Sequence, residues 1–255
     1  MTGKRYLKTI LIFTGICICA TVVSSFIVPK TAQKLPDKLV VLTFDDAIAT
    51  QYSVVMPLLK KYGFGATFFI CEFPPDFADK SKYMSWEQIT SLSNAGFEIA
   101  NHTKSHTQVS NYGDNMAEKF AADLDSIEKR CVQYGITKPV NFAYPSYTTN
   151  PVASRVLREK GYRFARTGGE RTWKPASDDP MLIPSFNAHG NDSAKVFADI
   201  DQAKKGEIVV LTLHGVPDRV HDWVNLEPRL FERYLQYMKQ KGCTVISLKD
   251  VLNYK

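Results

Sequence analysis

Beyond about residue 38, the chain alternates short runs of β-forming residues with longer segments of helical periodicity, and this alternation is the strongest constraint on its fold. We predict strands at 39–44, 66–70, 97–100, 140–144, 162–165, 208–213 and 244–247. We predict helices at 52–62, 86–96, 116–134, 151–159 and 227–241. Repeated alternation of this kind implies a parallel sheet with helices outside it, and the number of units favours closure into an α/β barrel.

Two local signals refine this prediction. Ser85 followed three residues later by Gln88 has the spacing of a capping box, which places the start of the second helix. Residues 168–193 are loop-rich and contain three prolines, so we expect an insertion or a lid there.

The composition is that of one globular domain, which we assign to residues 38–255. The chain has 255 residues, of which 44% are hydrophobic and 12% aromatic, enough to bury one substantial core. The net charge is only +6, and the Lys and Arg residues beyond the N-terminus are scattered among acids, so nucleic acid is not an expected partner. Cys71, Cys131 and Cys243 cannot all pair within the chain, which excludes a disulfide-dense scaffold.

The N-terminal segment has the pattern of a targeting signal. Lys4, Arg5 and Lys8 precede an apolar run over about residues 9–28. We therefore expect residues 1–30 to be a signal peptide or a membrane anchor. The run approaches the roughly 20 residues that span a bilayer, so both forms stay open. Either form implies export to the periplasm, the cell envelope or the extracellular space, with membrane contact only through this segment if it is uncleaved.

Polar residues suited to metal binding follow three of the predicted strands. Asp45 and Asp46 follow the run 39–44, His102 and His106 follow the run 97–100, and His214 follows the run 208–213. The carboxyl ends of strands are where α/β proteins build their sites. Carboxylates and imidazoles are ligands that suit a divalent metal such as zinc.

These residues belong to four motifs that resemble the polysaccharide deacetylases, the NodB-homology or carbohydrate esterase family 4 enzymes. The motifs are Thr43-Phe44-Asp45-Asp46, His102-x-x-x-His106, Phe142-Ala143-Tyr144-Pro145 and Leu211-Thr212-Leu213-His214. Their order and spacing agree with the family from about residue 38 to the C-terminus. The resemblance implies a distorted, incomplete (β/α) barrel of the NodB-homology type, with a metal held by one Asp and two His.

The family's roles transfer to matching positions of this sequence. The resemblance implies that Asp46, His102 and His106 hold the metal, with Zn²⁺ the expected ion, that Asp45 is the general base and that His214 is the general acid. Elementary chemistry supports these roles, because a zinc-like ion with open positions lowers the pKa of water, and a neighbouring carboxylate can take the proton. An imidazole can then protonate a departing amine. A backbone N–H near Pro145 and Ser146 is expected to stabilise the oxyanion.

The third motif departs from the family pattern. The family often has Arg-x-Pro-Tyr where this chain has Ala143-Tyr144-Pro145-Ser146, so the arginine that orients the catalytic carboxylate is missing. Arg166, at the end of the next predicted strand, could supply the same positive charge, and we treat it as a catalytic candidate. Ala47 also stands where the family has glycine, which is expected to narrow that loop.

Four residues are predicted to contact substrate: Tyr144, Pro145, Ser146 and Trp223. An Asp-Trp motif that the family places before the last motif is not evident, and Asp222-Trp223 follows His214 instead. Trp223 could stack on a sugar face. No motif gives His189 or His221 a role.

The leading interpretation is an exported, metal-dependent hydrolase that removes N-acetyl, or O-acetyl, groups from a carbohydrate or polysaccharide, with an acetylated glycan as its partner. One alternative keeps the site but cleaves another non-peptide C–N bond, as in amides and imides. The other is a carbohydrate-binding protein of this fold that has lost catalysis, suggested by the altered third motif. The intact set of metal ligands, base and acid argues against that alternative.

Overall fold

The computed structural model describes residues 1–3, 33–73, 80–190 and 192–254. The chain divides into two units, residues 1–31 and 32–255, and the strands and helices of the described residues belong to the second. The predicted signal peptide or anchor lies almost entirely outside the described residues. Within the described part of the chain, no helix is long and apolar enough to cross a membrane.

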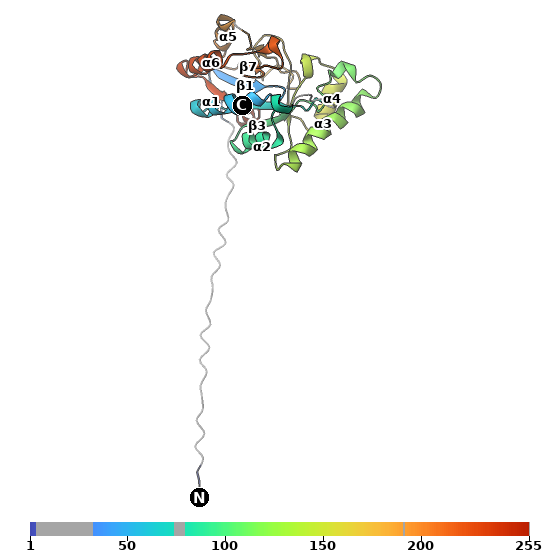
Figure 1. Cartoon of the computed structure of the whole chain (residues 1–255), viewed down its shortest axis with the longest axis vertical. Coiled ribbons are helices and arrows are strands. Elements are labelled where there is room, and N and C mark those ends of the chain that lie inside the picture. The colour runs from blue at the N-terminus through green and yellow to red at the C-terminus, as the bar shows by residue number, and fades with distance from the viewer. Residues whose placement is uncertain (4–32, 74–79, 191, 255) are drawn as a thin grey trace. The chain divides into compact units, whose positions relative to one another are not determined.

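The second unit is built on one parallel sheet (Figure 1). Its strands are β1 (Leu39–Phe44), β2 (Thr67–Ile70), β3 (Glu98–Asn101), β4 (Asn141–Ala143), β5 (Phe164–Arg166), β6 (Phe186–Asn187), β7 (Ile208–Leu213) and β8 (Thr244–Ile246). The order along the sheet is β5-β4-β3-β2-β1-β7-β6, and β8 pairs with the first half of β1. Because all of these pairings are parallel, the carboxyl ends of the strands lie at the same edge.

The sheet curls into a barrel that its named strands do not close. No pairing joins β5 directly to β6 among the described residues. Instead the segment after β5 returns beside it, where Ile183 N–H donates to Ala165 O at 2.8 Å and Thr167 N–H donates to Ile183 O at 2.7 Å. The expected distorted, incomplete (β/α) barrel is confirmed.

The central strands are buried on both faces because they separate two apolar layers. In β1, Val40, Leu42 and Phe44 pack in the layer between the sheet and the helices, whereas Leu39 and Val41 face the barrel interior. Strand β7 divides its residues in the same way, in register with β1. Full burial of such side chains contributes about 1.5–3 kcal/mol each, so the apolar runs 39–44 and 208–213 form the centre of the fold.

In the part of the chain that the structure describes, six α-helices and several shorter helical turns connect the strands. The α-helices are α1 (Met56–Tyr62), α2 (Trp86–Asn94), α3 (Met116–Gln133), α4 (Pro151–Glu159), α5 (Ser193–Ile200) and α6 (Pro228–Gln240). A π-helical turn, η1 (Gln51–Val55), precedes α1, and the 3₁₀ turns are η2 (Lys80–Lys82), η3 (Val109–Asn111), η4 (Pro145–Tyr147), η5 (Asp222–Val224) and η6 (Leu248–Asn253). Figure 1 shows α3 beside α4 and α5 beside α6, and these two pairs are in contact.

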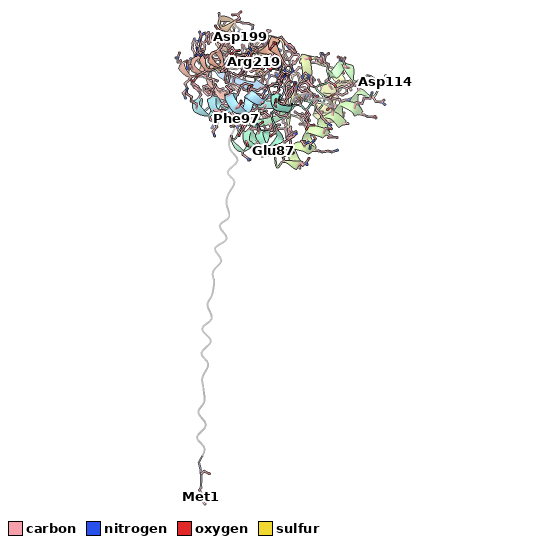
Figure 2. All side chains as sticks on the ribbon, in the orientation of Figure 1. Met1, Glu87, Phe97, Asp114, Asp199 and Arg219 are labelled. Carbon is pink, nitrogen blue, oxygen red and sulfur yellow. The ribbon has the colours of Figure 1, made fainter. Side chains whose placement is uncertain are left out.

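Local signals located most helix boundaries. The capping box before α2 is present, with Gln88 N–H donating to Ser85 Oγ at 3.3 Å and Ser85 N–H donating to Gln88 Oε1 at 3.0 Å. Charged side chains such as Glu87 on α2, Asp114 before α3 and Arg219 after β7 are exposed, and Figure 2 shows Asp114 at the outer edge of the molecule. On α6 the buried residues are Phe231, Tyr234, Leu235 and Met238, whose spacing places them on one apolar face of the helix.

The stretch 168–193 differs from the prediction. It contains the two-residue strand β6, and helix α5 begins at its end. Trp173 and Ile183 of this stretch are buried in the barrel interior, so it forms part of the wall instead of an insertion or lid. Sequence periodicity could not detect β6, because two residues show no alternation.

Candidate active site

The carboxyl edge of the sheet carries a cavity of about 510 Å³. Strands β1, β3, β4, β6 and β7, or the loops that follow them, deliver polar side chains to it. The cavity is lined by Asp45, Asp46, Phe73, His102, His106, Ser146, Tyr147, Asn187, His189, His214, His221, Trp223 and Val224. Five of the residues predicted for the metal and the proton transfers thus line one cavity.

Asp46, His102 and His106 form a group with the geometry of a metal site. One ligand atom from each lies within 4.8 Å of the others. Asp46 Oδ1 lies 3.5 Å from His102 Nε2 and 3.3 Å from His106 Nε2. His102 Nδ1 lies 2.8 Å from the carbonyl oxygen of Ala143, which fixes the proton on Nδ1 and leaves the lone pair of Nε2 facing Asp46.

The electrostatics of this group fit a divalent cation. Burial lowers the pKa of His102 to about 4 and that of His106 to about 3, so both imidazoles are neutral and can donate lone pairs at neutral pH. Burial, helped by the charge of Asp45, raises the pKa of Asp46 to about 7. A buried carboxylate beside a second one is costly unless a positive charge compensates it. One carboxylate and two neutral imidazoles are a donor set that suits zinc.

The pKa of Asp45 is not raised like that of Asp46, because Asp45 has a cationic partner. Arg166 Nη2 donates to Asp45 Oδ2, and both side chains are buried. Burial by itself would raise the pKa of Asp45, but Arg166, His102 and His214 lower it, and it lies below its ordinary value of 3.8. The guanidinium lies 5.4 Å from the ring of Phe69 and 5.2 Å from that of Tyr147, which fix its position. Asp45 is therefore ionised at neutral pH.

His214 lies on the other side of the carboxylate pair. Its Nε2 is 3.8 Å from Asp46 Oδ2, and its Nδ1 has no hydrogen-bond partner among the described residues. Burial lowers the pKa of His214 to about 4, with Asp45 opposing and Arg166 assisting this effect. The imidazole is therefore neutral at neutral pH, and a proton that it donates must first be taken up.

The third motif requires a correction. Tyr144 does not line the cavity: its side chain is buried against Phe142, and its hydroxyl lies 3.0 Å from Ser154 Oγ. Pro145 is also buried and absent from the lining. The backbone turns at Ser146 and Tyr147, whose φ angles are 52° and 58°, and this brings those two residues to the cavity. Of the predicted substrate contacts, Ser146 and Trp223 lie at the cavity.

The sequence did not identify several cavity residues. Tyr147 comes from η4, Asn187 is the last residue of β6, and His189 follows that strand. His221 lies seven residues after His214. His221 is half-buried against the site and is not an ordinary exposed loop histidine. Its closeness in sequence to the end of β7 was the available signal, since loops at that edge supply site residues.

The loops at the site hold non-glycine residues in the left-handed region. The φ angles are 73° at Asp46, 54° at Ala47, 59° at Thr103 and 54° at His106. Each such residue costs about 1–2 kcal/mol. The positive φ of Ala47 agrees with the glycine expected at this position from the family pattern, because a glycine adopts this conformation without steric cost.

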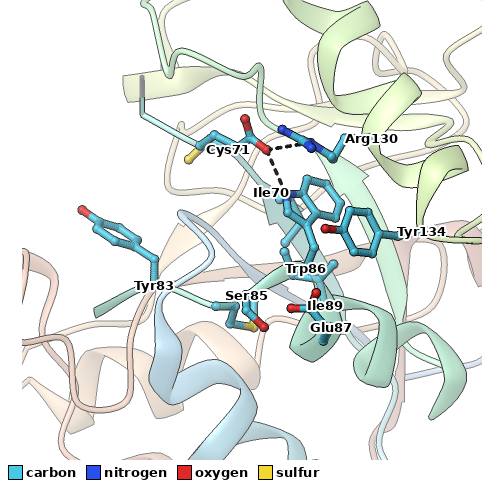
Figure 3. A pocket seen from close by; sticks show the side chains of 11 residues that line it. Ile70, Cys71, Tyr83, Ser85, Trp86, Glu87, Ile89, Arg130 and Tyr134 are labelled. Carbon is cyan, nitrogen blue, oxygen red and sulfur yellow. Dashed lines mark hydrogen bonds and ion pairs between the residues drawn. The ribbon is translucent and has the colours of Figure 1, made fainter. Parts of the chain in front are cut away.

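A second cavity, of about 350 Å³, lies on the other side of the loop that follows β2. Figure 3 shows the stacked rings of Trp86 and Tyr134 beside Arg130 in this cavity. Glu72 accepts a hydrogen bond from Trp86 Nε1 at 2.8 Å and pairs with Arg130 at 3.3 Å. Glu72, Trp86 and Arg130 are therefore paired with one another. Cys71 of this cavity lies close to the metal group, with its Sγ 3.7 Å from Asp46 Oδ1.

The fold and the site together define a class of protein. Its members are incomplete parallel α/β barrels with carboxylates and imidazoles at the carboxyl edge of the sheet. The sequence model of the polysaccharide deacetylase family matches residues 32–165, more than half of the chain. The protein therefore belongs to the polysaccharide deacetylase family.

Individual relatives agree with this family. A peptidoglycan-N-acetylglucosamine deacetylase of Bacillus cereus is 26% identical over 220 residues, covering 86% of this chain and 90% of the relative. A putative polysaccharide deacetylase from Mycobacterium smegmatis has a similar structure, with a TM-score of 0.62 at 16% identity over 86% of this chain and 92% of that one. The chitin deacetylase of the fungus Colletotrichum lindemuthianum gives a TM-score of 0.61 at 17% identity, over 88% and 91%. At these identities the two structures support the fold alone.

Proposed function

We propose that this protein is a metal-dependent hydrolase that removes acetyl groups, N-acetyl and by extension O-acetyl, from a carbohydrate or polysaccharide. The observation that carries the proposal is that two carboxylates with different pKa values meet the imidazoles of His102, His106 and His214 in one cavity. Asp46 faces two neutral imidazoles, whereas Asp45 is ionised beside Arg166. Different environments for paired carboxylates are typical of acid–base sites.

Asp46, His102 and His106 would hold the metal. Zn²⁺ is the ion that this donor set suits best. A bound divalent cation supplies Lewis-acid polarisation of the acetyl carbonyl and lowers the pKa of water. The protein's contribution is to fix the three donors on the rigid ends of β1 and β3 and on the loop after β3.

Asp45 would act as the general base. Its carboxylate is ionised, and Oδ1 has no hydrogen-bond partner among the described residues, so this oxygen can accept the proton of the attacking water. Arg166 holds the other oxygen and replaces the arginine that the third motif lacks. This places the orienting charge on β5 instead of β4.

His214 would act on the leaving group from the opposite side. Since the buried imidazole is neutral before the reaction, it takes up a proton from solvent and passes it to the departing amine, while Asp45 returns to solvent the proton that it accepted from the attacking water. The C–N bond of the acetamide breaks, and acetate and a free amine form. The backbone around Ser146 lines the cavity and is the candidate donor to the oxyanion.

The substrate class follows from the family and from the opening of the cavity. Trp223 is 74% exposed at its rim, and an exposed aromatic ring can stack on a sugar face. The relative from Bacillus cereus is named for N-acetylglucosamine in peptidoglycan. An acetylated envelope glycan, reached after export directed by residues 1–30, is therefore the proposed substrate. Membership of the polysaccharide deacetylase family argues against cleavage of another non-peptide C–N bond. The complete set of polar groups at the site argues against a binding protein that has lost catalysis.

The test combines metal content with turnover. The full chain, purified in detergent, is expected to hold one zinc-like ion and to release acetate from N-acetylglucosamine oligomers. Asp45→Asn should retain the metal and lose about 10²-fold or more in kcat, because the base is gone. His102→Ala should lose the metal. Elemental analysis and acetate release measure both properties.

The outcomes separate the alternatives. Full turnover in Asp45→Asn would contradict the base assignment. A wild-type chain that binds no zinc but binds glycan would support the degenerate binding protein instead.

A further inference from the structure

We propose that His221 is a positioning residue for the metal-ligating carboxylate of Asp46, and that Asp218 holds His221 in place. This inference rests on the proposed function, since it concerns the same metal site. It assigns a role to a residue that lies outside the four sequence motifs.

The two oxygens of Asp46 face different groups. Oδ1 faces the ligand pair His102 and His106 at 3.5 and 3.3 Å. Oδ2 faces His221 Nδ1 at 3.7 Å and His214 Nε2 at 3.8 Å. Rotation of the carboxylate would exchange these environments, so a group that binds Oδ2 also determines which oxygen faces the ligand pair.

Nδ1 of His221 lies between two carboxylates. It is 3.7 Å from Asp46 Oδ2 and 3.6 Å from Asp218 Oδ2, and no hydrogen bond satisfies it within the described protein. A lone pair pointing at two carboxylate oxygens would be repelled by both. The proton of the imidazole therefore resides on Nδ1, where it attracts Asp46 Oδ2.

Asp218 is built into the protein in a way that fixes His221. Its side chain is fully buried and accepts backbone hydrogen bonds from Gly215, Val220 and His221 at 3.1, 2.9 and 2.7 Å. Any Cβ at Gly215 would lie 2.7 Å from the Cα of Asp218, so the loop packs tightly on this residue. Asp218 thereby fixes His214 and His221 on one rigid loop.

Aromatic neighbours hold the imidazole ring from its other sides. The ring centroid of His221 lies 5.3 Å from Trp223 and 6.1 Å from Phe73. A ring held by packing and by a buried carboxylate keeps its nitrogen in place without an entropic cost at the time of metal binding. Outer partners of this kind typically change metal affinity by about 10–100-fold.

The test uses two substitutions that distinguish the ring nitrogens. Asparagine places its amide nitrogen near the position of Nδ1, whereas glutamine places it near Nε2. We expect His221→Leu and His221→Gln to bind zinc about 10–100-fold more weakly than the wild type, and His221→Asn to stay close to wild-type affinity. Competition of the metal-free full chain with a chromophoric chelator at neutral pH gives the zinc dissociation constants.

His189→Leu is the matched control, because His189 lines the same cavity but makes no described contact with Asp46. Its zinc affinity should equal that of the wild type. Wild-type affinity in His221→Leu, or equal weakening in His221→Asn and His221→Leu, would overturn the inference alone. A wild-type chain that binds no zinc would overturn the proposed function as well. Thermal unfolding of the metal-free variants shows that each is folded.

Discussion

Adjacent carboxylates at the end of β1 acquire opposite protonation behaviour from their surroundings. Asp45 and Asp46 are neighbours in the chain and equally buried, yet the pKa of Asp45 is lowered and that of Asp46 is raised to about 7. The difference is Arg166, which pairs with Asp45 alone. At the residue scale, one buried guanidinium thus separates a base from a metal ligand.

Replacing Arg166 should therefore change the pH dependence of the reaction. In Arg166→Met the burial of Asp45 remains while its cation is lost, so the pKa of Asp45 rises and the base stays protonated to higher pH. The acid limb of the kcat/KM profile is expected to move to higher pH, and kcat to fall by about 10²-fold. A pH–rate profile with an acetylated chitooligosaccharide measures both effects.

Arg166→Lys is the control for this prediction, because it keeps the charge and loses the planar fork. It should shift the acid limb less than Arg166→Met. An acid limb that stays in place in Arg166→Met would show that Arg166 does not tune the base.

At the scale of elements, a buried polar network ties the strands together at the edge opposite the site. Glu98 at the start of β3 accepts hydrogen bonds from Thr67 Oγ1, Asn141 Nδ2 and the backbone N–H of Lys249, at 2.8, 2.6 and 2.8 Å. Thr67 Oγ1 in turn accepts from Leu248 N–H at 2.8 Å. One carboxylate therefore joins β2, β3 and β4 to η6, and these hydrogen bonds hold the strand ends in register.

Removing this carboxylate should destabilise the barrel. Glu98→Ala leaves three donors without this acceptor, two of them buried, and we expect a loss of about 3 kcal/mol in the free energy of unfolding. Glu98→Gln keeps one acceptor oxygen and should cost less. Urea unfolding of the metal-free protein measures the change.

Glu159 offers a matched comparison, since it is exposed on α4 and pairs with Arg155 at 3.7 Å. Glu159→Ala should change stability by no more than about 0.5 kcal/mol. Equal effects at Glu98 and Glu159 would contradict a structural role for the network.

At the scale of the whole molecule, the site opposes folding when no metal is bound. Burial lowers the pKa values of His102, His106 and His214 from 6.5 to about 4, 3 and 4, so the unfolded chain binds their protons more readily than the folded chain. Asp46, with its pKa raised to about 7, acts in the opposite direction. The lowered pKa values of these three imidazoles outweigh the raised pKa of Asp46, so these groups bind more protons in the unfolded chain than in the folded chain between pH 6.5 and 4.

The stability of the metal-free protein should therefore decrease as the pH falls from 6.5 towards 4. Denaturant unfolding across this range checks the sign. At neutral pH, zinc at about 1,000 times its dissociation constant should add about 4 kcal/mol, an increment that His102→Ala abolishes. Stability that rises on acidification through this range would contradict the neutral state of the buried imidazoles.

The sequence by itself determined what depends on local pattern. It predicted the strands β1 and β7 and the capping box of α2, because apolar runs and helix caps depend on residues that are neighbours in the chain. It also contains the motifs that supply Asp45, Asp46, His102, His106 and His214. It also pointed to Arg166, which the structure pairs with Asp45 across 121 residues. The incomplete barrel followed from the same motifs.

The tertiary structure alone decided where several of these side chains point. Tyr144 packs in the core against Phe142, and positive φ at Ser146 and Tyr147 then turns the chain to the cavity, a turn for which a single sequence carries little signal. His221 meets Asp46 because Asp218 folds the loop after β7 back on the site. Such contacts join residues that are distant along the chain or separated by an irregular turn, and their energy arises only once the barrel has formed.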